Sequence, residues 1–141
     1  MKTIAVTRVL TAAEVLAFDA GVSYTIATAP PAGYLLKFKY AVLAKLSGTA
    51  VGTVSGVWDL FYVGESTSLA QISAADAENL VDTGAAAANY IIHTEYGTDD
   101  LDLVAEDCVA KGIEIKATGN TANSDATIQI TVVADLIKIG R

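Results

Sequence analysis

The last third of the chain alternates apolar and polar residues with a period of two. Residues 113–117 have the sequence Ile-Glu-Ile-Lys-Ala, and residues 128–132 have the sequence Ile-Gln-Ile-Thr-Val. The stretch between them, residues 118–125, consists mostly of Thr, Gly, Asn, Ser and Asp, which favour turns. This pattern is typical of two antiparallel strands of a half-buried sheet, and it predicts a hairpin that closes the fold.

The same alternation predicts further strands at residues 3–9, 22–26, 34–42, 57–63 and 90–96. In the longest of them, Lys37 and Lys39 lie on one face, and the opposite face is apolar. We expect that apolar face to be buried together with apolar positions of the other strands. The predicted core comprises Leu36, Phe38, Tyr40, Val42, Trp58, Leu60, Ile128, Ile130 and Val132.

Local signals outside the strands predict little helix. Thr11 and Glu14 have the spacing of a capping box, which predicts a short N-terminal helix. A second helical turn is expected at residues 73–80. Gly48, Gly52 and Gly56 recur every four residues, and we expect a loop or a close approach of backbones there. Short strands separated by turns favour an all-β fold, a jelly-roll-like antiparallel β-sandwich with one short N-terminal helix, formed by residues 1–141 as a single domain.

The composition limits the classes of partner. Charged residues make up 18% of the 141 positions, compared with about 25% in an average soluble domain, so we expect part of the surface to be covered by a partner or by other copies. The net charge of −7 argues against binding to nucleic acid or to an anionic membrane. Neither a signal peptide nor a membrane-spanning run is visible, which predicts synthesis and folding in a cytoplasm.

The sequence offers few groups for catalysis. Cys108 is the single cysteine and is expected to be a small half-buried thiol. His93 and Glu95 lie on the same strand face, but one His beside one acid is more often a surface pair than an acid–base site. Residues 52–56 are one residue out of register with a hydrolase nucleophile elbow. We therefore expect no enzyme, no cofactor and no catalytic residue.

Acidic residues gather near the end of the predicted fifth strand and beyond it. Their order does not match an EF-hand loop, so calcium binding and a solvated or docking surface both stay open for residues 99–107. The cluster comprises Glu95, Asp99, Asp100, Asp102, Glu106 and Asp107.

Two pairs of residues are candidates for an interface. Lys37 and Lys39 either meet acidic groups of a partner or make an edge strand soluble. Near the C-terminus the apolar phase slips by one residue, so that Ile137 and Ile139 occupy odd positions. Either a bulge near Asp135 returns them to the core, or they cover a partner, which we favour.

The order of several segments resembles that of small decoration, or cement, proteins of tailed-bacteriophage capsids. The resemblance rests on residues 10–15 (Leu-Thr-Ala-Ala-Glu-Val), residues 29–34 (Ala-Pro-Pro-Ala-Gly-Tyr), residues 111–115, residues 117–120 and residues 124–132. Residues 66–88 depart most from any such pattern. The resemblance implies a jelly-roll-like fold and no catalytic site.

The resemblance also implies a role and partners. It predicts a virion protein that binds the outside of an assembled capsid and stabilises it by bridging capsid subunits. Its partners would be the major capsid protein and its own copies, as a dimer or trimer, with neither nucleic acid nor a membrane. The alternative is a carbohydrate- or receptor-binding β module of a phage tail or fibre, which a row of exposed aromatic residues on one sheet face would favour.

Overall fold

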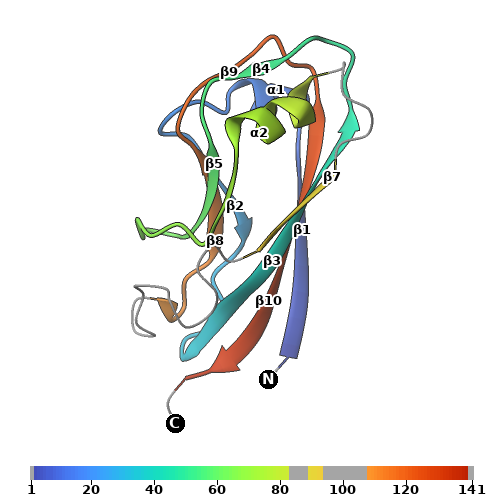
Figure 1. Ribbon diagram of the computed structural model, residues 1–141. Helices are drawn as coiled ribbons and strands as arrows, with labels where there is room; N and C mark the ends of the chain where they lie inside the picture. The colour runs from blue at the N-terminus through green and yellow to red at the C-terminus, as the bar shows by residue number, and fades with distance from the viewer. Residues whose placement is uncertain (1, 83–88, 94–107, 140–141) are drawn as a thin grey trace.

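The computed structural model describes residues 2–82, 89–93 and 108–139, which form two four-stranded antiparallel sheets (Figure 1). Sheet A has the strand order β1 (Lys2–Leu10), β10 (Thr127–Lys138), β3 (Tyr34–Ser47) and β7 (Asn89–His93). Sheet B has the order β2 (Ser23–Ala27), β8 (Ile113–Ala117), β5 (Trp58–Tyr62) and β6 (Ala70–Ile72).

The strands pair as in one long antiparallel hairpin that is folded over to form the two sheets. β1 pairs with β10, β2 with β8, β3 with β7, and β5 with β6. The pairings of β10 with β3 and of β8 with β5 then complete the two sheets. Eight strands connected in this way form a jelly roll, which confirms the predicted all-β sandwich.

The predicted closing hairpin is wrong. β8 belongs to sheet B and β10 to sheet A, so the chain crosses from one sheet to the other between them. The alternation marked both strands correctly, but it carries no information on which strand each one pairs with. The long turn-rich connection, which includes the short β9 (Thr121–Ala122), spans the gap between the sheets.

The two helices that the structure describes along their whole length lie at one end of the sandwich, which we call the helical end (Figure 1, top). They are α1 (Ala12–Leu16) and α2 (Ala74–Val81), next to the two-stranded pair of β4 (Thr53–Val54) and β9. α1 begins at the predicted capping box, in which the Thr11 hydroxyl accepts from the Glu14 amide and the Glu14 carboxylate accepts from the Thr11 amide. α2 is a complete second helix with Ser73 at its N-cap, where the sequence indicated only a turn. β1 begins and β10 ends at the opposite, terminal end.

Most of the predicted core is buried, but the predicted phase of β3 holds for only half of the strand. Leu36 and Phe38 are each 2% exposed, whereas Tyr40 and Val42 are half-buried and Ala41 and Leu43 are fully buried in their place. The register explains the change, because Val133 pairs with Tyr40 and the next residue, Ala134, pairs with Phe38. Lys39 is therefore the extra residue of a β-bulge, and a bulge exchanges the inward and outward positions beyond it.

Tyr62 joins the two sheets through the interior. Its side chain is 4% exposed, and its hydroxyl donates to the Leu36 carbonyl at 2.5 Å and accepts from the Phe38 amide at 3.4 Å. β7 pairs with β3 only from Tyr40 to Ala44, so the Tyr62 hydroxyl serves the β3 backbone beyond the end of that ladder. Burial raises the pKa of Tyr62 to about 12, and the phenol stays protonated as a donor.

The glycines at the helical end allow backbones to meet, as their spacing predicted. A Cβ on Gly56 would collide with the backbone of Gly119, and one on Gly52 would collide with the Val81 carbonyl. Asp125 fastens the neighbouring loop by accepting from the Thr49 hydroxyl and from the amides of Ala50 and Thr49, and these hydrogen bonds lower the pKa of Asp125 to about 2. The helical end is thus a closely packed set of loops.

Candidate binding surfaces

The structure gathers few of the chemical candidates from the sequence into a site. The backbone of His93 lies in β7 opposite Tyr40, while Glu95 and residues 99–107 lie outside the described residues. Cys108 is 6% exposed and belongs to the hydrophobic core. Within the described ranges, no three His, Cys, Asp or Glu side chains are grouped as metal ligands. In the same ranges, no helix is long and apolar enough to cross a membrane.

Two buried carboxylates on sheet B are satisfied by neighbours within the chain. Asp59, 5% exposed, accepts from the Gln71 amide at 2.9 Å and from the Ser68 hydroxyl at 3.0 Å. Glu114 pairs with Lys116 at 3.1 Å, and the Lys116 ammonium also lies 5.1 Å from the centre of the Phe61 ring. Because each charge has a partner, these groups hold the sheet surface together rather than await a ligand.

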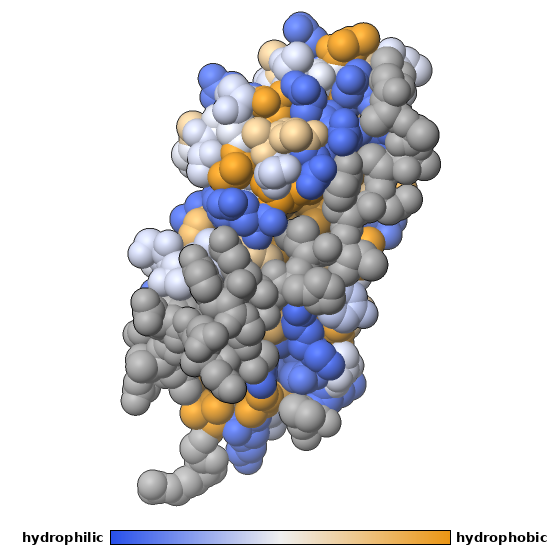
Figure 2. All heavy atoms as spheres, in the orientation of Figure 1, coloured by the Kyte–Doolittle hydropathy of each residue, from blue (hydrophilic) through white to orange (hydrophobic). Residues whose placement is uncertain are grey.

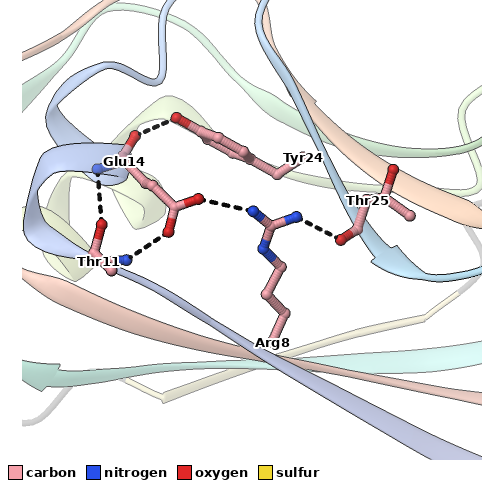
Figure 3. A network of polar contacts seen from close by, with 5 residues as sticks. All are labelled: Arg8, Thr11, Glu14, Tyr24 and Thr25. Atoms are coloured by element: carbon pink, nitrogen blue, oxygen red, sulfur yellow. Dashed lines mark hydrogen bonds and ion pairs between the residues drawn. The ribbon is translucent and has the colours of Figure 1, made fainter.

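A network of polar contacts joins the edges of the two sheets where β1 and β2 meet, and we call it the seam clasp (Figure 3). The Arg8 guanidinium donates to the Thr25 carbonyl at 2.8 Å and to the Glu14 carboxylate at 2.7 Å, and it lies 5.2 Å from the centre of the Tyr24 ring. The Tyr24 hydroxyl donates to the Glu14 carbonyl at 2.7 Å. The sequence analysis did not predict this clasp. Arg8 lies at an even position of β1, like Ile4 and Val6, which face inward, and a charged residue at such a position could have indicated a buried polar contact.

The clasp makes stability depend on the ionisation of Glu14. The Thr11 amide that donates to Glu14 holds the pKa of that carboxyl below its ordinary value, and the Arg8 guanidinium acts in the same direction. A lowered folded-state pKa contributes stability that is present above the unfolded-state pKa and is lost as the pH falls through the folded-state pKa. Glu14→Gln keeps a capping-box residue but removes the charge, so we expect a loss of about 0.2–1 kcal/mol at neutral pH.

Urea titrations of both proteins from neutral pH to about pH 2 measure this difference. The difference between wild type and Glu14→Gln should shrink below the ordinary pKa of a glutamate and disappear in acid. A difference that stays constant over the whole range would show that the charge of Glu14 is not what stabilises the clasp.

Toward the terminal end the seam between the sheets opens into a groove of about 200 Å³, which we call the seam groove. Its lining is mostly apolar, and it lies between the inward-facing residues of β1 and the connection from β2 to β3. The lining residues are Ile4, Val6, Ala27, Thr28, Ala29, Pro30, Pro31, Leu36 and Leu136. A second hollow of about 300 Å³ lies on the other side of that connection, where Thr25, Val63 and Lys111 are among the lining residues.

Lysines gather at the terminal end of sheet A, which we call the lysine end. Lys37 and Lys39 are exposed as predicted, and the Lys39 ammonium lies 4.0 Å from the Asp135 carboxylate. Lys2 and Lys138 are also exposed, and the register places them within a few residues of Lys37 on the three adjacent strands β1, β10 and β3. Within the part of the chain that the structure describes, no carboxylate forms an ion pair with Lys2, Lys37 or Lys138. Among the described residues, four lysine side chains therefore gather at this end of an acidic protein.

Ile137 and Ile139 are half-buried at this same end and pack against the core. Ile137 pairs with Leu35, and the Ile139 amide donates to the Gly33 carbonyl at 2.7 Å. The bulge that was one explanation of the phase slip exists, but it lies in β3 at Lys39, opposite Val133 and Ala134. Both side chains keep a partly exposed surface, and their role as an interface stays a prediction.

Apolar side chains are exposed mainly at the helical end. Val9, Leu16, Leu46 and Val51 are between 45% and 67% exposed, and all lie near the loops of that end. Figure 2 shows apolar residues at this end and again near the terminal end of the visible face.

The fold, but not the sequence, is similar to that of known proteins. No protein-family description matches the chain, and no curated protein matches it. A chain in the acidic stable capsid structure of Helicobacter pylori bacteriophage KHP30 superposes with a TM-score of 0.52 at 12% identity, over 100% of this chain and 95% of that chain. A chain in the capsid asymmetric unit of cyanophage Pam1 gives a TM-score of 0.48 at 16% identity, over 99% and 84% of the two chains.

Proposed function

We propose that this protein is a structural component of a tailed-bacteriophage virion that binds the outside of the assembled capsid and stabilises it by bridging neighbouring subunits. The observation that carries the proposal is the complete jelly roll, whose likeness to the KHP30 capsid chain covers 100% of this chain and 95% of that one.

The surface chemistry supports the same role. The charged fraction of the whole chain is low, and the carboxylates on sheet B are paired with neighbours inside the chain, so the described surface offers no evident reacting group. Positive side chains at the lysine end suit an acidic partner, and complementary charge guides a protein to its partner and fixes its orientation. The partners are the major capsid protein and other copies of this chain.

Co-sedimentation with empty capsids of the phage that encodes the chain tests this proposal. Purified protein should pellet with capsids and saturate at a fixed number of copies per capsid, because the sites are set by the shell lattice. Protein that stays in the supernatant at every concentration tested would refute the proposal.

The lysine end should contribute to that binding. Changing Lys37 and Lys39 together to Glu reverses two exposed charges, and we expect roughly tenfold weaker capsid binding at low salt and a smaller difference at high salt. The matched variant is Lys37→Gln with Lys39→Gln, which removes the two charges without reversing them and should give an intermediate loss of binding. Unchanged occupancy of the Glu variant would favour the simpler interpretation that these lysines only make the strand soluble.

A carbohydrate- or receptor-binding module of a tail or fibre is the second candidate. Such modules stack sugar rings on a row of exposed aromatic side chains. Among the aromatic residues whose side chains the structure describes, Phe18, Phe38, Trp58 and Tyr62 are buried, and Tyr24, Tyr34, Tyr40 and Phe61 are half-buried. The described surface therefore favours the capsid role.

A further inference from the structure

We propose that the outer edge of β1 and the seam groove beside it bind an extended strand of a neighbouring shell protein. The bound strand would carry apolar residues at two alternate positions and an acidic residue two positions beyond the second of them. This inference rests on the proposed function and names the chemistry of the contact. It follows from three features of β1: an open backbone edge, an apolar groove along that edge, and positive charges at the end of the groove.

The first feature is the backbone. β1 pairs with β10 along all nine of its residues, and within the described ranges no strand pairs with its other side. The seam clasp occupies this side only around Arg8, where the side chain reaches the Thr25 carbonyl. From Thr3 to Thr7, alternate amides and carbonyls point away from β10, and an unpaired edge of this kind is a template for another strand.

The second feature is the groove. Ile4 and Val6 face inward in β1 but stay half-exposed because they line the seam groove with Leu136. The opposite wall contains Pro30 and Pro31, which have no backbone N–H to donate. These two prolines offer an occupant no backbone donor, whereas the open edge of β1 offers donors and acceptors in alternation, so an occupant that pairs with β1 places its apolar side chains in the groove. At about 200 Å³ the groove is smaller than the roughly 300–1,000 Å³ of small-molecule sites, which fits a few side chains of a peptide better.

The third feature is charge. Lys2 lies two residues from Ile4 in β1, and Lys138 lies two residues from Leu136 in β10, in both cases toward the terminal end. Both lysines are therefore on the same face as the groove lining and at its open end. An acidic residue on the incoming strand, two positions beyond its second apolar residue, would meet them. In strand addition, main-chain hydrogen bonds give the affinity and pockets for alternate side chains give the specificity.

The same charges argue against a second copy of this chain as the occupant. If two β1 strands paired antiparallel over their open stretch, Thr3–Thr7, Lys2 of each would lie opposite Arg8 of the other. Like charges directly opposite each other destabilise a strand pair. A strand of different sequence, with an acid in that place, has no such conflict.

Hydrogen exchange of the full chain, free and bound to empty capsids, tests the inference directly. We expect the amides of residues 3–7 that point away from β10 to exchange at least tenfold more slowly on capsids, because an added strand protects them. If the protein binds capsids and these amides are unchanged, the inference is wrong and the proposed function stands. If the protein does not bind capsids at all, both fail. If the free protein already forms a dimer in which these amides are protected, the occupant is a second copy and the inference is overturned.

Two variants measure separately how much the apolar groove and the two lysines beside it contribute to capsid binding. Ile4→Asp places a carboxylate in the groove, and Lys2→Glu with Lys138→Glu reverses the charges at its mouth on exposed residues that the fold does not need. Each is expected to weaken capsid binding by roughly tenfold or more, with the free protein keeping its circular dichroism spectrum. Equal binding by the folded charge-reversed variant would overturn the acidic part of the inference, whether or not Ile4→Asp folds.

Discussion

Replacing Phe38 by alanine is expected to lower the free energy of unfolding by about 3–5 kcal/mol. The side chain is 2% exposed and lies at the last inward position of β3 before the bulge at Lys39, where the Tyr62 hydroxyl also accepts from the Phe38 amide. Deleting the ring leaves a cavity between the two sheets, and the bulge and the Tyr62 contact limit how far the backbone can move to fill it. Urea titration followed by tryptophan fluorescence measures the loss, since Trp58 lies in the same core.

The matched control is Lys37→Ala, one residue earlier in β3. Lys37 is exposed and forms no ion pair within the described residues, so its truncation should change stability by no more than about 0.5 kcal/mol. A loss below about 1 kcal/mol for Phe38→Ala, far under the usual cost of a buried Phe, would contradict the assignment of this face to the core.

Replacing Gly56 by alanine is expected to cost about 3 kcal/mol, at the upper end of the usual range for overpacking. The new Cβ would collide with the backbone of Gly119 and with the Thr118 hydroxyl, and backbone cannot rotate away as a flexible side chain can. The two loops would have to separate at the helical end, where the Asn120 amide donates to the Ser55 hydroxyl at 2.7 Å. Thermal and urea unfolding of the variant measure the loss.

Whether Gly56→Ala lowers or raises the free energy of unfolding is informative, because a glycine-to-alanine change without a steric clash usually raises it. Where a glycine has an ordinary backbone conformation and open space, alanine usually stabilises a protein by about 0.4–1 kcal/mol. Gly21→Ala gives the comparison, since its Cβ would meet nothing within 4 Å and only its left-handed φ of +87° opposes the change, at roughly 1–2 kcal/mol. A Gly56→Ala protein as stable as wild type would show that the loops do not pack as described.

Local patterns in the sequence predicted the elements of this fold well. The predicted strands, among them the one at residues 57–63 that contains β5, and the capping box at Thr11 and Glu14 depend on residues near one another in the chain. The sequence also resembled phage decoration proteins in layout, and the fold of the KHP30 capsid chain agrees with the jelly roll that this resemblance implied.

Features that depend on distant residues could not be predicted in the same way. The partner of β10 is β1, at the other end of the chain, so a turn-rich connection between β8 and β10 suggested a hairpin that does not form. The bulge at Lys39 follows from pairing with β10 and leaves no mark in the alternation of β3, which misassigned Tyr40 and Val42. The seam groove arises where two sheet edges meet, and only the fold brings Ile4 close to Pro30.

Heat release of DNA from capsids tests the central proposal most directly. Filled capsids that carry the protein and capsids from which it has been removed are heated in parallel, and free DNA is measured with an intercalating dye. A bridging protein binds only the assembled shell and does so at many sites at once, so the capsids that carry it should release their DNA at a higher temperature, and adding the purified protein back should restore that temperature. Equal release temperatures for the two preparations, with the protein shown to be bound to one of them, would contradict the proposal that it stabilises the shell.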